Sequence, residues 1–129
     1  MKRDLEIAGL AIDSAKERIE SARKLIEINN FSDAISRAYY GVLDAARAAL
    51  ILEKEMPKTH AGTISKFNQK FIKTSKVNKK YGPLLNKLER ARAEADYQFG
   101  VEFTKEEAES ILKDASNFVE MVIKLIEEN

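Results

Sequence analysis

Residues 5–26 read LEIAGLAIDSAKERIESARKLI, and this stretch decides the fold class. Its apolar positions alternate spacings of three and four, which places them on one face of a helix. The stripe runs through Leu5, Ala8, Ile12, Ala15, Ile19, Ala22 and Ile26. Such spacing over about six turns is typical of a long helix packed at a shallow angle in a bundle. Asp4 is the expected N-cap, and Asn29 and Asn30 are the expected end.

A second helix is predicted over about residues 33–54, with Ser32 as its N-cap. It should end near Met56 and Pro57, because proline disfavours helical conformation at the residue before it. Its apolar face is wide and contains a run of alanines that lets a neighbouring helix approach closely: Ala45, Ala46, Ala48 and Ala49. We therefore expect this helix to be the central and most buried one.

Three further helices are predicted downstream. A shorter one covers about residues 60–72 with Thr59 as its cap, and the next starts at Gly82 and Pro83 and fades near Phe99 and Gly100. Thr104 and Glu107 form a capping-box pattern for a last helix that runs to about residue 127. No stretch alternates as a strand would. The expected fold is all-α, with four long helices and one short one in a single domain over residues 1–129.

Composition excludes several classes of site. The chain has 129 residues, no Cys and one His, which removes disulfide scaffolds, thiolate metal sites and histidine clusters for zinc. We expect no metal and no cofactor. No apolar stretch approaches the ~18–20 residues of a membrane span, and no signal-peptide core is present, so the expected location is cytoplasmic without a membrane partner.

Charge is segregated although the net charge is only +1. Residues 58–92 contain ten Lys or Arg against the single Glu89, a difference of +9. With Phe67, Phe71 and Tyr81 interleaved, this pattern is the footprint expected for a polyanion such as RNA. The candidate RNA-binding residues are Lys66, Lys70, Lys73, Lys76, Lys79 and Lys80. The alternative is a solvated face that balances the acidic C-terminal helix, with Phe67 and Phe71 in the core.

Two arginines suggest a binding groove between helices. Arg37 lies on the helix expected to be most buried, and Arg92 lies four residues before Asp96, so that these two share a face with Tyr97 beside them. Arg37 and Arg92 could hold a phosphate bidentately, and Asp96 could orient them or act on a proton. The alternative is a simple Arg92–Asp96 ion pair, with Arg37 extending to the surface.

Other polar residues of the central helix are further ligand-binding candidates: Tyr40, Asp44 and Arg47. A buried guanidinium needs a carboxylate partner or an open cleft. His60 is the only side chain of the sequence with an ordinary pKa near neutrality, which makes it the candidate general acid–base if the protein is an enzyme. Its alternative role is that of a helix cap or surface residue.

The run SRAYYGVLDAARAAL at residues 36–50 resembles a helix of small stand-alone HEPN proteins (higher eukaryote and prokaryote nucleotide-binding domain). Further similar segments are KTHAG at 58–62, the segment from Arg92 to Tyr97, and the ending from Glu106 to Val119, so that the likeness spans about residues 31–123. The resemblance implies an up-and-down helical bundle and frequent homodimers. It also implies frequent pairing with a small nucleotidyltransferase in a toxin–antitoxin couple.

The likeness has one departure that bears on activity. Many HEPN proteins are ribonucleases with an Arg, four to six residues and then a His, whereas here Tyr97 follows Arg92 at that spacing and Asp44 stands where many relatives have His. Metal-independent cleavage, in which the ribose 2′-hydroxyl attacks the phosphate, then lacks its expected acid–base group. The favoured hypothesis is nucleotide or RNA binding through Arg37, Arg92 and residues 58–92, beside a nucleotidyltransferase. The alternatives are a ribonuclease toxin that uses Arg92, Asp96, Tyr97 and His60, and a structural partner subunit without catalysis.

Overall fold

The computed structural model describes residues 2–97 and 100–128, and the elements within these ranges are all helical. They are α1 (Lys2–Glu27), α2 (Phe31–Leu52), α3 (His60–Phe67), the π-helical turn η1 (Asn68–Ile72), α4 (Tyr81–Tyr97) and α5 (Lys105–Glu127). The expected all-α fold with four long helices and one short one is confirmed for this part of the chain. Phe99, where α4 was expected to fade, lies outside the described residues.

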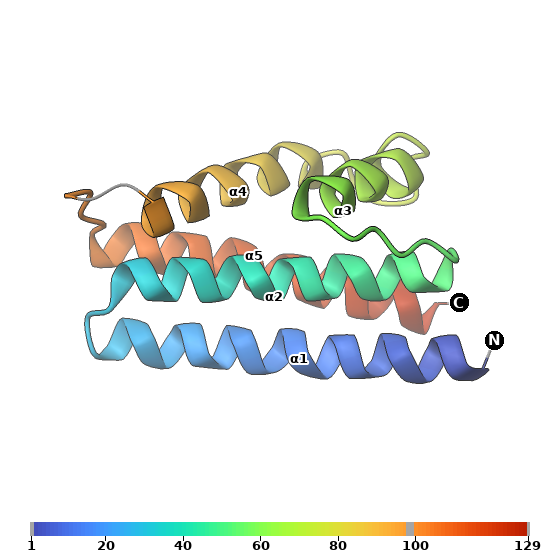
Figure 1. Ribbon diagram of the computed structural model, residues 1–129, viewed down its shortest axis with the longest axis horizontal. Coiled ribbons are helices and arrows are strands. Elements are labelled where there is room, and N and C mark those ends of the chain that lie inside the picture. Colours follow the sequence, from blue (N-terminus) through green and yellow to red (C-terminus); the bar gives the residue numbers. More distant parts are fainter. Residues whose placement is uncertain (1, 98–99, 129) are drawn as a thin grey trace.

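Successive long helices run in opposite directions, so α1, α2, α4 and α5 form an up-and-down bundle (Figure 1). Helix α2 lies in the middle, where it contacts α1, α3, α4 and α5. Its buried residues extend from Ala34 to Ile51 and include the expected alanines, which confirms that α2 is the central helix. None of the helices in the described ranges is both long enough and apolar enough to cross a lipid bilayer.

Small residues bring α1 and α2 close together. A Cβ added at Gly41 would lie 3.2 Å from the Ala15 carbonyl oxygen and 3.2 Å from Ile19 Cδ1. The stripe of α1 is buried from Ala8 to Ile26, as its spacing predicts. Leu5 is the exception, at 56% exposed, because α2 already ends at Leu52 opposite this turn of α1.

The helix caps follow the sequence in part. Thr59 accepts a hydrogen bond from the Gly62 amide (2.9 Å), and Thr104 and Glu107 form the expected capping box. Asn29, with φ of 64°, ends α1 as expected. Two expectations are wrong. Asp4 lies inside the first turn of α1, where it accepts from Lys54 Nζ (3.2 Å), and Ser32 lies inside α2, which begins one residue earlier.

The aromatic residues of the basic stretch belong to the core. Phe67 and Phe71 are 0% and 4% exposed, and the Phe67 ring lies 4.9 Å from Phe71 and 5.2 Å from Phe118. The ring of Tyr81, at the start of α4, also packs edge-on against Phe118, with the ring centroids 5.9 Å apart. The expectation that Phe67 and Phe71 stack on bases is therefore wrong, because their rings fill the space between η1 and α5.

Candidate functional site

One face of α2 meets α3 and α4 through aromatic and charged side chains. We call this group the Arg92 cluster, and its members are Ser36, Tyr39, Tyr40, His60, Glu89, Arg92, Asp96 and Tyr97. The cluster brings together all four candidate catalytic residues of the sequence, one of which, His60, comes from α3 and three from α4. It also includes Tyr40, one of the candidate ligand-binding residues.

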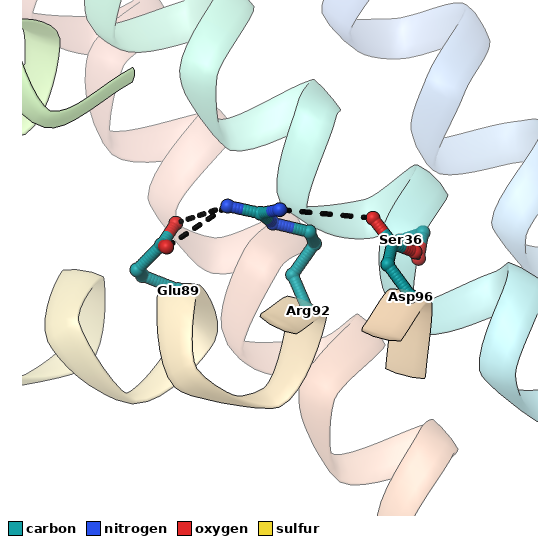
Figure 2. Close-up of polar contacts among 4 residues, drawn as sticks. All are labelled: Ser36, Glu89, Arg92 and Asp96. Carbon is teal, nitrogen blue, oxygen red and sulfur yellow. Dashed lines mark hydrogen bonds and ion pairs between the residues drawn. The ribbon is translucent and has the colours of Figure 1, made fainter. Parts of the chain in front are cut away.

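Arg92 is the centre of the cluster. The residue is only 7% exposed, and its Nη2 donates hydrogen bonds to both carboxylate oxygens of Glu89 (2.9 and 3.0 Å). Its Nη1 lies 3.7 Å from Asp96 Oδ2, so the ion pair expected from the i,i+4 spacing is present. Figure 2 shows the guanidinium between these two carboxylates. Asp96 in turn accepts a hydrogen bond from the Ser36 hydroxyl, which ties α4 to α2.

Aromatic rings surround the same guanidinium. Arg92 Cζ lies 5.1 Å from the ring centroid of Tyr39 and 5.6 Å from that of Tyr97, both within cation–π range. The His60 ring packs edge-on against Tyr39 (6.0 Å) and Tyr40 (5.7 Å). Tyr39 is 1% exposed whereas Tyr97 is 70% exposed. The cluster therefore extends from a buried phenol to an aromatic ring in solvent, with a cation and an imidazole that contact the same tyrosine.

The environment of the cluster raises three pKa values. Burial raises the pKa of Tyr39, and the nearby Glu89 carboxylate raises it further. Burial also raises the pKa of Tyr40, with a contribution from Asp96. For Arg92, burial lowers the pKa, but the hydrogen bond and charge of Glu89 more than offset this, so the net change is upward. At neutral pH the two phenols keep their protons and can donate hydrogen bonds, and Arg92 is a permanent cation.

These shifts predict a loss of stability at high pH. A phenol in the unfolded chain ionises near pH ~10, whereas the folded chain keeps the Tyr39 proton at that pH. The unfolded state therefore binds fewer protons, and the free energy of unfolding falls as pH rises above ~10. We expect Tyr39→Phe to reduce this fall, measured from urea denaturation midpoints between about pH 8 and 11. Equal pH dependence in wild type and variant would contradict the prediction.

A second polar group joins α1 to α2 beside the cluster. Asp44 accepts hydrogen bonds from Ser14 Oγ (2.7 Å) and Arg18 Nε (2.8 Å). Arg18 Cζ lies 5.8 Å from the Tyr40 ring centroid, so this group continues from the Arg92 cluster. Arg47, another candidate ligand-binding residue, follows Asp44 one turn later on α2 and is half-buried.

The structure does not bring Arg37 into the cluster. Its exposed side chain instead lines a depression with Ser21, Lys24 and Leu25 of α1. The groove expected between Arg37 and Arg92 is therefore not formed, because the two guanidinium groups contact different neighbours of α2. The sequence reasoning missed Glu89, Ser36, Tyr39, Ser14 and Arg18 as site residues, although Glu89 stands out as the one acidic residue of the basic stretch.

The candidate RNA-binding lysines divide into three groups. Lys66 Nζ and Lys70 Nζ lie 3.8 and 3.7 Å from Glu55 Oε1, and Lys76 Nζ lies 3.3 Å from Glu53 Oε1. These two carboxylates, which follow α2 in the sequence, therefore offset part of the positive charge of residues 58–92. Lys80 lies over the Tyr81 ring (5.1 Å). Lys73 and Lys79 are exposed.

Lys87, another basic residue of α4, pairs with Asp114 of α5 at 2.9 Å, as expected if the stretch balances the acidic last helix. Within residues 2–97 and 100–128, no three or more His, Cys, Asp or Glu side chains gather in a way that could hold a metal ion.

Comparisons with known proteins place the chain in a family. The family model described as "HEPN domain" matches residues 8–127. A Methanocaldococcus jannaschii protein named "Putative toxin" is 36% identical over 117 residues, which cover 91% of this chain and 87% of that protein. A Thermotoga maritima protein named "UPF0332 protein" is 32% identical, with 88% and 86% of the two chains covered. A second M. jannaschii protein with the same toxin name is 32% identical over 97% of this chain and 83% of its own. The chain belongs to the HEPN domain family.

Proposed function

We propose that this protein is the HEPN member of a toxin–antitoxin-type pair and binds a nucleotide or RNA at the Arg92 cluster. The observation that carries the proposal is the position of Arg92, held between helices α2 and α4 with one buried and one exposed tyrosine ring beside its guanidinium. A guanidinium is suited to a phosphate, and an exposed aromatic ring is suited to a base. Two relatives that bear a toxin name support the toxin–antitoxin context.

Exposed lysines would add to binding without adding sequence preference. Lys73 and Lys79 lie in the segment that precedes α4, and both side chains are exposed. Each lysine that neutralises a phosphate releases counterions, so the affinity for RNA falls as salt rises.

The test is fluorescence anisotropy of the protein with a labelled single-stranded RNA over a range of salt concentrations. We expect the logarithm of affinity to fall linearly with the logarithm of salt. Changing both Lys73 and Lys79 to alanine should reduce the slope by about 0.7 for each lost phosphate contact. Lys16→Ala on the exposed face of α1 is the matched control and should leave the slope unchanged. Absence of affinity even at low salt would instead favour a structural partner subunit.

One observation favours the ribonuclease as a second candidate. The imidazole of His60 and the guanidinium of Arg92 contact the same Tyr39 ring, so an acid–base group lies near the cation although Tyr97 replaces the family's usual His. If His60 takes the proton of the ribose 2′-hydroxyl, the 2′-oxygen attacks the adjacent phosphorus and the bond from phosphorus to the 5′-oxygen breaks. The 5′-oxygen takes up a proton, so the products carry a 2′,3′-cyclic phosphate and a 5′-hydroxyl. His60→Ala should then abolish cleavage but keep binding, and a 2′-deoxy substitution at the cut site should block it.

The proposed partner is a small nucleotidyltransferase, and a homodimer is the proposed assembly. Both expectations come from the family. Affinity purification from the native cell, followed by identification of the bound proteins and determination of the mass of the complex, tests them together. Recovery of a nucleotidyltransferase in stoichiometric amount supports the pair. Recovery of the HEPN protein alone, as a monomer, contradicts both.

A further inference from the structure

Two buried polar atoms of the Arg92 cluster have no protein hydrogen-bond partner in the part of the chain that the structure describes. They are the hydroxyl oxygen of Tyr39 and Nε of Arg92, on residues that are 1% and 7% exposed. Leaving such atoms unpaired in the interior lowers stability, and most native proteins avoid it. Two cases at one place therefore point to a partner from outside the chain, either a ligand or a water molecule.

The two atoms belong to adjacent groups of matching chemistry. Arg92 Cζ lies 5.1 Å from the Tyr39 ring centroid. Arg92 Nε always carries a proton, and the raised pKa of Tyr39 keeps its hydroxyl protonated. Both atoms are therefore hydrogen-bond donors, and one of them is charged. Donors fixed in a site with little water are suited to an anionic oxygen such as that of a phosphate.

Glu89 competes for the same cation. Both of its carboxylate oxygens lie on Arg92 Nη2, and its side chain is 37% exposed whereas that of Arg92 is 8% exposed. Glu89 also lines a hollow of about 490 Å³ between α3, η1 and α4, and Lys73 lines the same hollow. The carboxylate can thus leave Arg92 for a solvated space that contains another cation.

We propose that the Tyr39 hydroxyl and Arg92 form a phosphate-oxygen site that Glu89 closes by holding the guanidinium. An incoming phosphate displaces the Glu89 carboxylate into the hollow and takes its place on Arg92, and Tyr39 donates to a second oxygen. The proposal rests on the proposed function, since the phosphate is that of the nucleotide or RNA. Tyr39 and Glu89 then set the affinity of the site that Arg92 centres.

The first experiment changes the competing carboxylate. Glu89→Gln keeps the size of the side chain and removes its charge, so we expect the affinity for inorganic phosphate to rise about tenfold, as for one charge-assisted hydrogen bond. Isothermal titration calorimetry at constant ionic strength measures it. Asp114→Asn is the matched control, because it removes the same charge from an ion pair with Lys87 on the surface of α4 and α5. Equal affinities in wild type and Glu89→Gln would overturn the proposal.

The second experiment removes the unpaired hydroxyl. Tyr39→Phe should leave the melting temperature nearly unchanged, because the hydroxyl has no hydrogen-bond partner among the described residues. We expect it to lower the affinity for phosphate and for single-stranded RNA about tenfold. If the hydroxyl has only a structural role, or if a water molecule is its partner, the affinity for phosphate and RNA should be unchanged in Tyr39→Phe. If Glu89→Gln does not fold, the RNA affinity of Tyr39→Phe, compared with that of the wild type, tests the proposal by itself.

The outcomes separate this proposal from the proposed function. Wild type that binds RNA, with affinities unchanged in both variants, overturns the phosphate site and leaves RNA binding intact. If the wild type does not bind RNA but Glu89→Gln binds phosphate in a way that depends on Tyr39, the result supports the phosphate site and contradicts RNA binding by the native chain. No binding of phosphate or RNA by any of these proteins overturns both.

Discussion

Arg92→Ala is expected to lower the affinity for single-stranded RNA at least about tenfold, because it removes the charged donor of the site. It should also lower the free energy of unfolding by about 2 kcal/mol, since Glu89 and Asp96 lose their shared cation. This loss is below the range for a fully buried pair, because their side chains are 37% and 23% exposed. Anisotropy and urea denaturation measure the two effects.

Arg90→Ala is the control for this prediction. Arg90 lies two residues before Arg92 on α4, carries the same charge and is exposed. Its removal should change RNA affinity less than about threefold and stability by less than about 0.5 kcal/mol. Arg92→Lys keeps the charge without the planar donor geometry, and an intermediate affinity is expected. An equal loss of affinity in the Arg90 and Arg92 variants would show that the Arg92 cluster is not the binding site.

Phe118→Ala is expected to lower the free energy of unfolding by about 3–5 kcal/mol, as is typical of phenylalanine truncation in a core. The residue is 0% exposed, and its ring joins α5 to Phe67 of α3 and to Tyr81 of α4. Removing it leaves a cavity where the short helix, α4 and α5 meet. Urea denaturation measures the change as a lower midpoint with an unchanged slope.

Leu10→Ala provides the comparison for Phe118. Leu10 is 68% exposed on α1, so its truncation should change stability by less than about 0.5 kcal/mol. A loss below about 1 kcal/mol for Phe118→Ala would mean that the neighbouring rings collapse into the space and that the core is less tightly packed than the structure shows.

The helices could be predicted because their signals are local. The three-and-four spacing of α1 and the Thr104–Glu107 capping box depend only on residues near one another in sequence. The start of α2 could not be predicted in this way, since Asn30, Ser32 and Asp33 are all residue types that are favoured at the N-cap. Half-buried Phe31 packs against the core as the first residue of α2, so tertiary packing, and not cap preference, decides where the helix begins.

The site could be predicted only where its residues share one helix. The i,i+4 spacing predicts the Arg92–Asp96 ion pair. The expectation that Arg37 faces Arg92 is wrong, because Arg37 lies on the side of α2 that faces α1. Each residue turns a helix by about 100°, so Arg37 and Tyr39 point in directions about 160° apart. Only one of them can face α4, and the sequence of α2 alone does not say which. The Glu89 partner of Arg92 and the Glu53 and Glu55 partners of the lysines likewise depend on tertiary contacts.

The uneven anchoring of α4 has a consequence for how the proposed phosphate ligand would reach Arg92. The buried residues of α4 are Gly82, Leu85, Leu88 and Arg92, so its last turns are held by one buried cation, by half-buried alanines and by the Ser36–Asp96 hydrogen bond. Helix α2, by contrast, has buried residues from Ala34 to Ile51. A local opening of the end of α4 exposes few apolar atoms and requires much less free energy than global unfolding. If Arg92 binds the proposed phosphate, we expect the ligand to exchange through fraying of this one helix while α1, α2 and α5 stay packed.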